Sequence, residues 1–153
     1  SGGMYALLRH PDQYARLRRE PERIPVAVEE MLRWVTPIQN MNRTATRDVE
    51  LCGATIRAGD KVLLLYPSAN RDESVFDDPF SFDVTRNPNP HVGFGFGTHF
   101  CLGASLARFE LGIVVEELTS RLTSLRVVEE TDDEPNMFAT GVRSFRLGFD
   151  RRT

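Results

Sequence analysis

The sequence lacks both an excess of basic charge and a long apolar run. Its 153 residues include 19 Lys or Arg against 22 Asp or Glu, which gives a net charge of −3. Nucleic-acid binding draws on clustered positive charge, so we expect no nucleic-acid partner. No apolar stretch approaches the roughly 20 residues that a membrane-spanning helix needs, so we expect no membrane segment in this chain.

Cysteine is also scarce, since only Cys52 and Cys101 are present. We expect no disulfide, because Cys101 belongs to a motif of its own, and a reducing cytoplasmic location fits this cysteine usage. Internal repeats and low-complexity tracts are absent. With 41% hydrophobic residues, a chain of this length can bury one core, which predicts a single domain at most.

The most informative segment is the glycine-rich run from Phe94 to Gly103, which contains Cys101 and is followed directly by a helical pattern. A thiol at the start of a helix lies among unpaired backbone N–H groups and at the positive end of the helix dipole. Both favour the thiolate over the thiol. The glycines allow the backbone to turn tightly and to approach something large and flat.

Three interpretations of this segment compete. Cys101 can be a structural cysteine in a glycine-rich turn. A zinc-binding module would use His91, His99 and Cys101, but structural zinc normally takes four ligands and no fourth has a paired spacing. An axial thiolate to haem iron needs one cysteine, an apolar shelf such as Phe94 and Phe100, and cations such as His91 and His99 for the propionates.

The spacing of the segment resembles the haem-binding signature of the cytochrome P450 family. Phe94, Gly97, Cys101 and Gly103 match its fixed positions. A histidine two residues before the cysteine, here His99, resembles the sequences of the soluble bacterial branch. The resemblance implies that Cys101 is the axial ligand of a haem b iron. The haem-binding residues that it implies are Arg43, His91, Phe94, Gly95, Gly97, His99, Cys101 and Gly103.

A second segment supports the resemblance. Residues 26–34 have a helical apolar pattern, and Glu30 and Arg33 lie three apart on it. Alone, such a pair is usually a solvated surface salt bridge. Upstream of the cysteine segment, it resembles the Glu-x-x-Arg motif of the same family, in which the pair is buried and holds the haem-side core together.

The sequence departs from the family at one position of this motif. The family usually has an arginine one residue before the phenylalanine of Phe82-Asp83, where it completes a triad with the Glu and the Arg. This chain has Ser81 there. Arg86 or Arg71 can replace the missing arginine, or the Glu30–Arg33 pair can stand without a third partner.

The remaining pattern predicts a mainly α fold with small β-sheets, in the α+β class. Helices are expected over 4–18, with a break at Pro11, and over 104–122, where apolar residues form a broad stripe. Short strands are expected over 42–56 and 61–66. A loop is expected over 129–135, and residues 137–140 and 144–149 are predicted to pair as a hairpin around Gly141.

The resemblance covers nearly the whole chain but only the C-terminal part of a typical member. It implies that residues 1–153 are the proximal haem-binding portion of a single domain whose upstream portion is absent from this chain. The implied function is that of a haem-thiolate monooxygenase, which hydroxylates or epoxidises a small organic substrate with O₂ and two electrons. We expect the chain to be inactive alone. A catalytically silent relative is the alternative within the family.

The resemblance also implies contacts and partners. An electron donor, either a ferredoxin or a flavoprotein, would dock on the proximal face, where Arg108 is a candidate contact. The guanidinium of Arg43 would reach a haem propionate. The expected substrate contacts are Pro37, Ile38, Gln39, Asn40, Met41 and Thr140.

Overall fold

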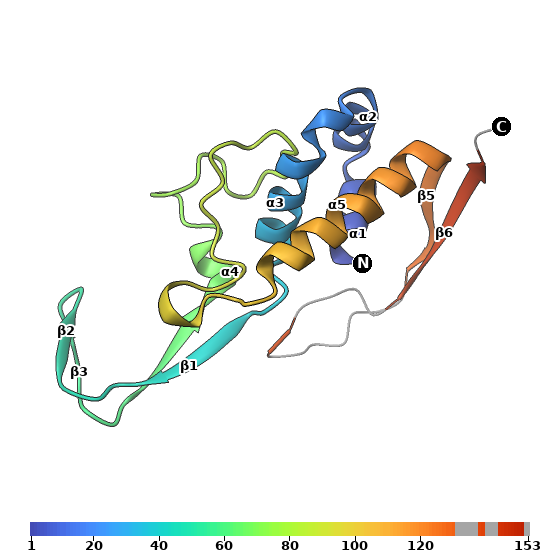
Figure 1. Ribbon diagram of the computed structural model, residues 1–153. Helices are drawn as coiled ribbons and strands as arrows, with labels where there is room; N and C mark the ends of the chain where they lie inside the picture. The colour runs from blue at the N-terminus through green and yellow to red at the C-terminus, as the bar shows by residue number, and fades with distance from the viewer. Residues whose placement is uncertain (131–137, 140–143, 152–153) are drawn as a thin grey trace.

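Four helices form the main body of the computed structural model, which describes residues 1–130, 138–139 and 144–151 (Figure 1). They are α1 (Gly2–Arg9), α2 (Pro11–Arg19), α3 (Ile24–Val35) and α5 (Ala104–Arg121). Pro11 occupies the first turn of α2, where its missing N–H would have had no partner, so the predicted break separates two helices. The helices expected over 4–18, 26–34 and 104–122 are confirmed.

Helix α3 is the centre of the hydrophobic core, in contact with both α1 and α5. Its apolar side chains recur at helical spacing and are buried together with Leu7 of α1, Leu17 of α2 and Val115 of α5. Unusually, α3 also buries the charged side chains of Glu30 and Arg33, both 0% exposed. A charged pair at the centre of a core requires partners for each polar atom.

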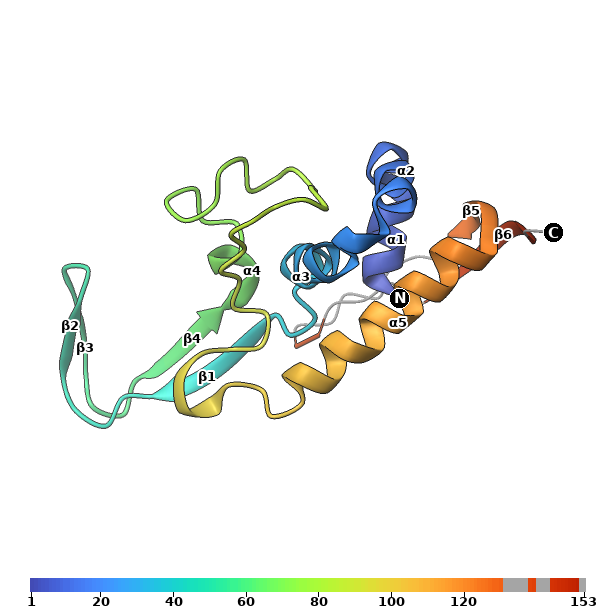
Figure 2. The ribbon, with the colours of Figure 1, turned by 45° about the horizontal axis from the view of Figure 1, so that its top comes forward.

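Two small antiparallel ribbons follow α3. Strand β1 (Asn40–Thr44) pairs with β4 (Lys61–Leu65), and β2 (Val49–Leu51) pairs with β3 (Ala54–Ile56). Strands β2, β3 and β4 fall within the ranges predicted to be extended, whereas β1 begins at Asn40, two residues before the predicted start. Cys52 and Gly53 have φ values of +49° and +79° and form the turn between β2 and β3, which projects away from the helices (Figures 1 and 2).

The predicted hairpin of 137–140 with 144–149 is wrong where the structure describes it. Strand β6 (Phe145–Arg151) pairs instead with β5 (Leu122–Glu130), which starts directly after α5 and includes Glu129 of the expected loop. Leu125 of β5 is buried, and Leu147 of β6 packs against the core, so this pairing buries apolar side chains. Met137, Thr140 and Gly141 lie outside the described residues.

Three short helical turns complete the described structure: η1 (Pro21–Arg23), α4 (Tyr66–Ala69) and η2 (Gly97–His99). Between α4 and η2 the chain has no regular elements, and it folds back against α3 (Figure 2). Within the described residues, no helix combines the length and the apolar character needed to cross a membrane.

Candidate functional site

Cys101 lies between η2 and the first turn of α5, as the sequence predicted. Its backbone N–H donates to the carbonyl of Phe94 (2.9 Å), which closes the loop on itself. Gly95 and Gly97 have φ values of +75° and +72°, in the left-handed region that side chains other than glycine rarely adopt. Gly95 and Gly97 are therefore required by the backbone path that presents Cys101.

The thiol of Cys101 is exposed, and so are the apolar side chains around it in the sequence. Phe96 is 86% exposed, and Leu102 is fully exposed. The loop lies beside the β1–β4 ribbon in both views (Figures 1 and 2). A Cβ placed on Gly95 would lie 3.7 Å from the hydroxyl of Tyr66, the first residue of α4. An exposed soft ligand with apolar neighbours fits a large apolar metal cofactor such as haem.

The zinc interpretation has no support in the part of the chain that the structure describes. No group of three or more His, Cys, Asp or Glu side chains there is arranged to hold a metal ion. His91 is turned toward Glu29 and Gly93, while His99 is exposed in η2. The donor set around Cys101 is a single thiol, which suits the axial position of a haem.

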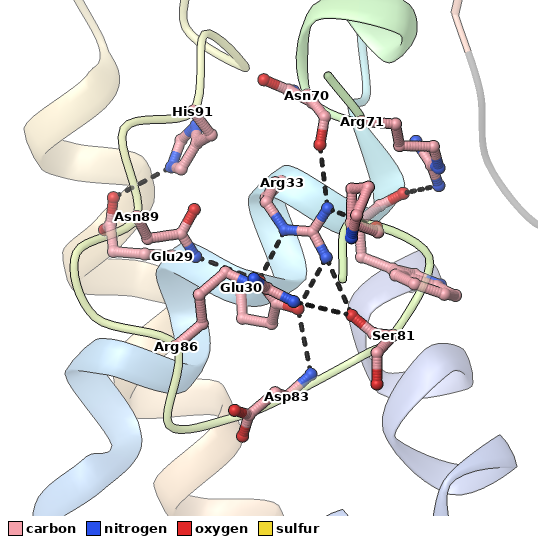
Figure 3. A network of polar contacts seen from close by, with 12 residues as sticks. Glu29, Glu30, Arg33, Asn70, Arg71, Ser81, Asp83, Arg86, Asn89 and His91 are labelled. Carbon is pink, nitrogen blue, oxygen red and sulfur yellow. Dashed lines mark hydrogen bonds and ion pairs between the residues drawn. The ribbon is translucent and has the colours of Figure 1, made fainter. Parts of the chain in front are cut away.

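The buried carboxylate of Glu30 on α3 accepts five hydrogen bonds (Figure 3). Arg33 makes two of them, from Nε to Oε2 (2.7 Å) and from Nη2 to Oε1 (2.8 Å). The remaining guanidinium N–H groups reach the backbone carbonyls of Asn70, Pro79 and Ser81. The Glu30–Arg33 pair is buried, as the resemblance implied. Through these bonds it joins α3 to the irregular segment that follows α4.

Arg86 supplies the third member of the network. Its Nε lies 3.2 Å from Oε2 of Glu30, and its other nitrogens donate to the carbonyls of Asp77, Asp78 and Ser81. Arg71 does not take this role, since its Nη2 donates to the carbonyl of Trp34. The choice that the sequence left open at Ser81 is therefore settled in favour of Arg86.

A second carboxylate of α3, that of Glu29, binds two further side chains, His91 and Arg108. Oε2 lies 3.0 Å from Nε2 of His91, and both carboxylate oxygens accept hydrogen bonds from Arg108 on α5 (2.7 and 2.9 Å). Burial raises the pKa of Glu29, but the bonds from His91 and Arg108 outweigh it and lower the pKa to about 2. Glu29 is thus an anion at neutral pH.

The remaining predicted site residues lie as follows. Arg43 is exposed on β1, where its Nη1 donates to the carbonyl of Asn42. Residues 37–41 run into β1, and the Gln39 N–H donates to the carbonyl of Phe138 (2.8 Å). The structure thus brings the 37–41 segment next to residues 138–139, directly before Thr140, which itself lies outside the described residues.

Several residues of the site were not found from the sequence. Asn70 is fully buried: its Oδ1 accepts the N–H of Val92 (2.8 Å), and its Nδ2 donates to Oγ1 of Thr36 (2.9 Å). Asn89 donates to Glu30 (3.0 Å), and Glu29 joins His91 to Arg108. These contacts join residues far apart in the chain, so no local spacing signals them.

The structure thus combines a cysteine loop before a helix with a buried Glu–Arg–Arg network, in a fold of helices and small sheets. The cytochrome P450 family model matches residues 1–147. The chain therefore belongs to the cytochrome P450 family, and this membership implies a haem cofactor.

Individual relatives agree with the family. The chain is 49% identical to the steroid C26-monooxygenase of Mycobacterium tuberculosis, over 97% of this chain and 41% of that protein. It is 47% identical to the methyl-branched lipid omega-hydroxylase of Mycobacterium bovis, over 93% of this chain and 34% of the relative.

Among solved structures, P450BioI in complex with an acyl carrier protein ligated to hexadec-9Z-enoic acid superposes with a TM-score of 0.94 at 43% identity. The match covers 97% of this chain and 39% of that one. The chain thus spans about one third to two fifths of the length of these proteins.

Proposed function

We propose that this chain forms the thiolate side of the haem site in a P450 monooxygenase, with Cys101 as the axial ligand of haem b. The observation that carries the proposal is the exposed thiol of Cys101, presented by a glycine loop that the Cys101 N–H closes on Phe94. The activity is proposed for the whole protein, of which residues 1–153 would be the proximal portion.

Different residues of the chain would bind different parts of the haem. Cys101 supplies the ligand sulfur, and the exposed side chains of Arg43 and His99 are free to approach the propionates from β1 and from η2. The bound haem would supply the oxidative chemistry, in which a thiolate ligand favours cleavage of the O–O bond. Both ring nitrogens of His91 already have partners within the protein, so we assign His91 a supporting role instead of direct contact.

For the substrate, we propose a largely apolar organic molecule that is hydroxylated or epoxidised. The relatives named above act on a steroid and on a methyl-branched lipid, and P450BioI was solved with a fatty acyl chain. In this chain, two exposed apolar side chains lie on adjoining segments: Met41, one of the expected substrate contacts, and Phe138, two residues before the expected contact Thr140. They would contact its hydrocarbon part.

We propose a ferredoxin or a flavoprotein as electron donor, docking near the start of α5. The Arg108 side chain is 36% exposed there although it is bound to Glu29. The two free cysteines are consistent with a reducing cytoplasmic location, which we also propose.

The ligand assignment is tested by Cys101→Ala in the complete protein. Loss of the sulfur should abolish the red-shifted Soret band of the reduced CO complex, because that band reports thiolate ligation. The matched control is Cys52→Ala, which removes the other exposed thiol, in the β2–β3 turn, and should leave the band intact. An unchanged band in Cys101→Ala would refute the assignment.

A further inference from the structure

We propose that Glu29 is a positioning residue for the axial thiolate, a role that rests on the proposed function of Cys101 as haem ligand. Glu29 lies on α3 and is itself not part of the cysteine loop. Its carboxylate holds two side chains, His91 and Arg108. His91 contacts Gly93 and Arg108 contacts Phe94, both in the segment that leads to Cys101. The loop is thereby fixed from the core side by a single anion.

The first arm runs through His91, whose side chain is 2% exposed. Nδ1 of His91 lies 3.1 Å from the backbone nitrogen of Gly93, and Nε2 lies 3.0 Å from Oε2 of Glu29. Because the Gly93 N–H can only donate, we assign Nδ1 as the unprotonated acceptor, so that Nε2 carries the proton and donates it to Glu29. The imidazole thus links the carboxylate to the backbone just before Phe94.

The second arm runs through Arg108, which binds Glu29 in a bidentate manner, with Nε and Nη2 at 2.7 and 2.9 Å from the two oxygens. The guanidinium carbon lies 4.7 Å from the centroid of the Phe94 ring, within the range of a cation–π contact. The carbonyl of Phe94 in turn accepts the N–H of Cys101. Only the aromatic residue and one backbone hydrogen bond separate the ion pair from the cysteine.

The negative charge of Glu29 should also affect the reduction potential of the bound haem. The carboxylate compensates the positive charge of Arg108, which stands against Phe94 in the cysteine loop. If Glu29 loses its charge, an uncompensated cation remains against Phe94 of the cysteine loop. A nearby cation stabilises the more electron-rich state of a redox site, so the reduction potential of the bound haem should rise.

The test uses the complete, haem-loaded protein that contains this chain, with Glu29→Gln as the variant. We expect the oxidised-to-reduced equilibrium of the haem to shift about threefold toward the reduced form, which corresponds to roughly 28 mV for one electron. We also expect part of the reduced CO complex to lose its red-shifted Soret band, because the loop is held less firmly. Glu110→Gln removes the same charge from an exposed position on α5 and should change neither readout.

A second variant keeps the test decisive if Glu29→Gln does not fold. Arg108→Gln removes the cation and its contact with Phe94 but leaves the Glu29–His91 bond, so the band should again be partly lost while the potential moves in the negative direction. In the double variant Glu29→Gln/Arg108→Gln, the potential should return toward the wild-type value while the band stays impaired.

The positioning role of Glu29 and the ligand role of Cys101 are overturned by different results. If the wild-type protein shows the red-shifted band, and the folded Glu29 and Arg108 variants keep both the band and the potential unchanged, the positioning role is overturned. If the wild-type protein itself lacks the band, the ligand assignment of Cys101 fails first, and the role of Glu29 falls with it.

Discussion

At the scale of single residues, the carboxylate of Glu30 needs several hydrogen-bond partners, because it is a charged group without access to water. It is fully buried, and its five hydrogen-bond donors come from Arg33, Asp83, Arg86 and Asn89. A buried ion pair contributes little net stability when all partners are present, but removing one partner leaves an uncompensated charge and is costly. The network therefore specifies one arrangement of the segment behind the cysteine loop.

This predicts that Arg86→Lys destabilises the complete protein although it keeps the charge. Lysine lacks the planar fork with which Arg86 reaches Glu30 and three backbone carbonyls at once. We expect a loss of about 2 kcal/mol in the free energy of unfolding, measured by urea titration. Arg47→Lys, at an exposed position between β1 and β2, is the control and should change it by less than about 0.5 kcal/mol. Equal stability of the two variants would contradict the role of Arg86.

Glu29 gives a prediction about pH. Its pKa of about 2 lies below the 4.5 of an ordinary glutamate, so the stabilisation it provides is fully present above pH 4.5 and is lost as the pH falls toward 2. The shift corresponds to about 3 kcal/mol at neutral pH, of which about 2 kcal/mol should be lost by pH 3. Gln cannot titrate, so the stability advantage of wild type over Glu29→Gln should shrink over that range. Urea titrations at pH 6 and pH 3 measure this, and a constant difference would contradict it.

The sequence identified Cys101, Glu30 and Arg33 because each lies at a fixed spacing within a short motif. It left Arg86 and Arg71 as equal candidates, since both are arginines of the same irregular segment. The choice depends on which one the folded backbone directs toward Glu30, 56 residues away along the chain from Arg86. For the same reason the sequence did not associate Glu29 with His91 and Arg108.

At the scale of elements, the helices were predictable because each carries its own periodic pattern and its own end signals. Strand β5 was missed because it follows α5 without a turn, with Leu122 directly after the last helical residue, Arg121. The partner of β6 was wrong because pairing is a tertiary choice. Proximity in the sequence favoured residues 137–140, whereas burial of Leu125 favours β5.

Replacing glycine with alanine should have opposite effects on stability in the cysteine loop and in α5. A Cβ at Gly97 would meet no atom within 4 Å, so Gly97→Ala is opposed only by the φ of +72° and should destabilise by about 1–2 kcal/mol. Gly112, inside α5, also has open space around it but helical backbone, so Gly112→Ala should stabilise by about 0.5–1 kcal/mol. Thermal unfolding of the two variants compares them, and two shifts of the same sign would contradict this account of the loop.

At the scale of the whole molecule, α5 has apolar side chains on more than one face. Ala104, Val115 and Thr119 are buried, whereas Leu106, Phe109, Ile113 and Val114, which the sequence placed in one broad stripe, are exposed. Exposed apolar surface of this kind marks sites where further protein or ligand packs. Together with the share of the relatives' length that the chain covers, this supports the proposal that its site is completed by additional polypeptide.

The most direct measurement for the central claim is the absorption spectrum of the complete wild-type protein, reduced and exposed to CO, combined with its iron and zinc content. We expect one iron per chain and a Soret band at the red-shifted position of a thiolate-ligated haem. A Soret band at the position of a haem without a thiolate ligand, or zinc in place of iron, would contradict it.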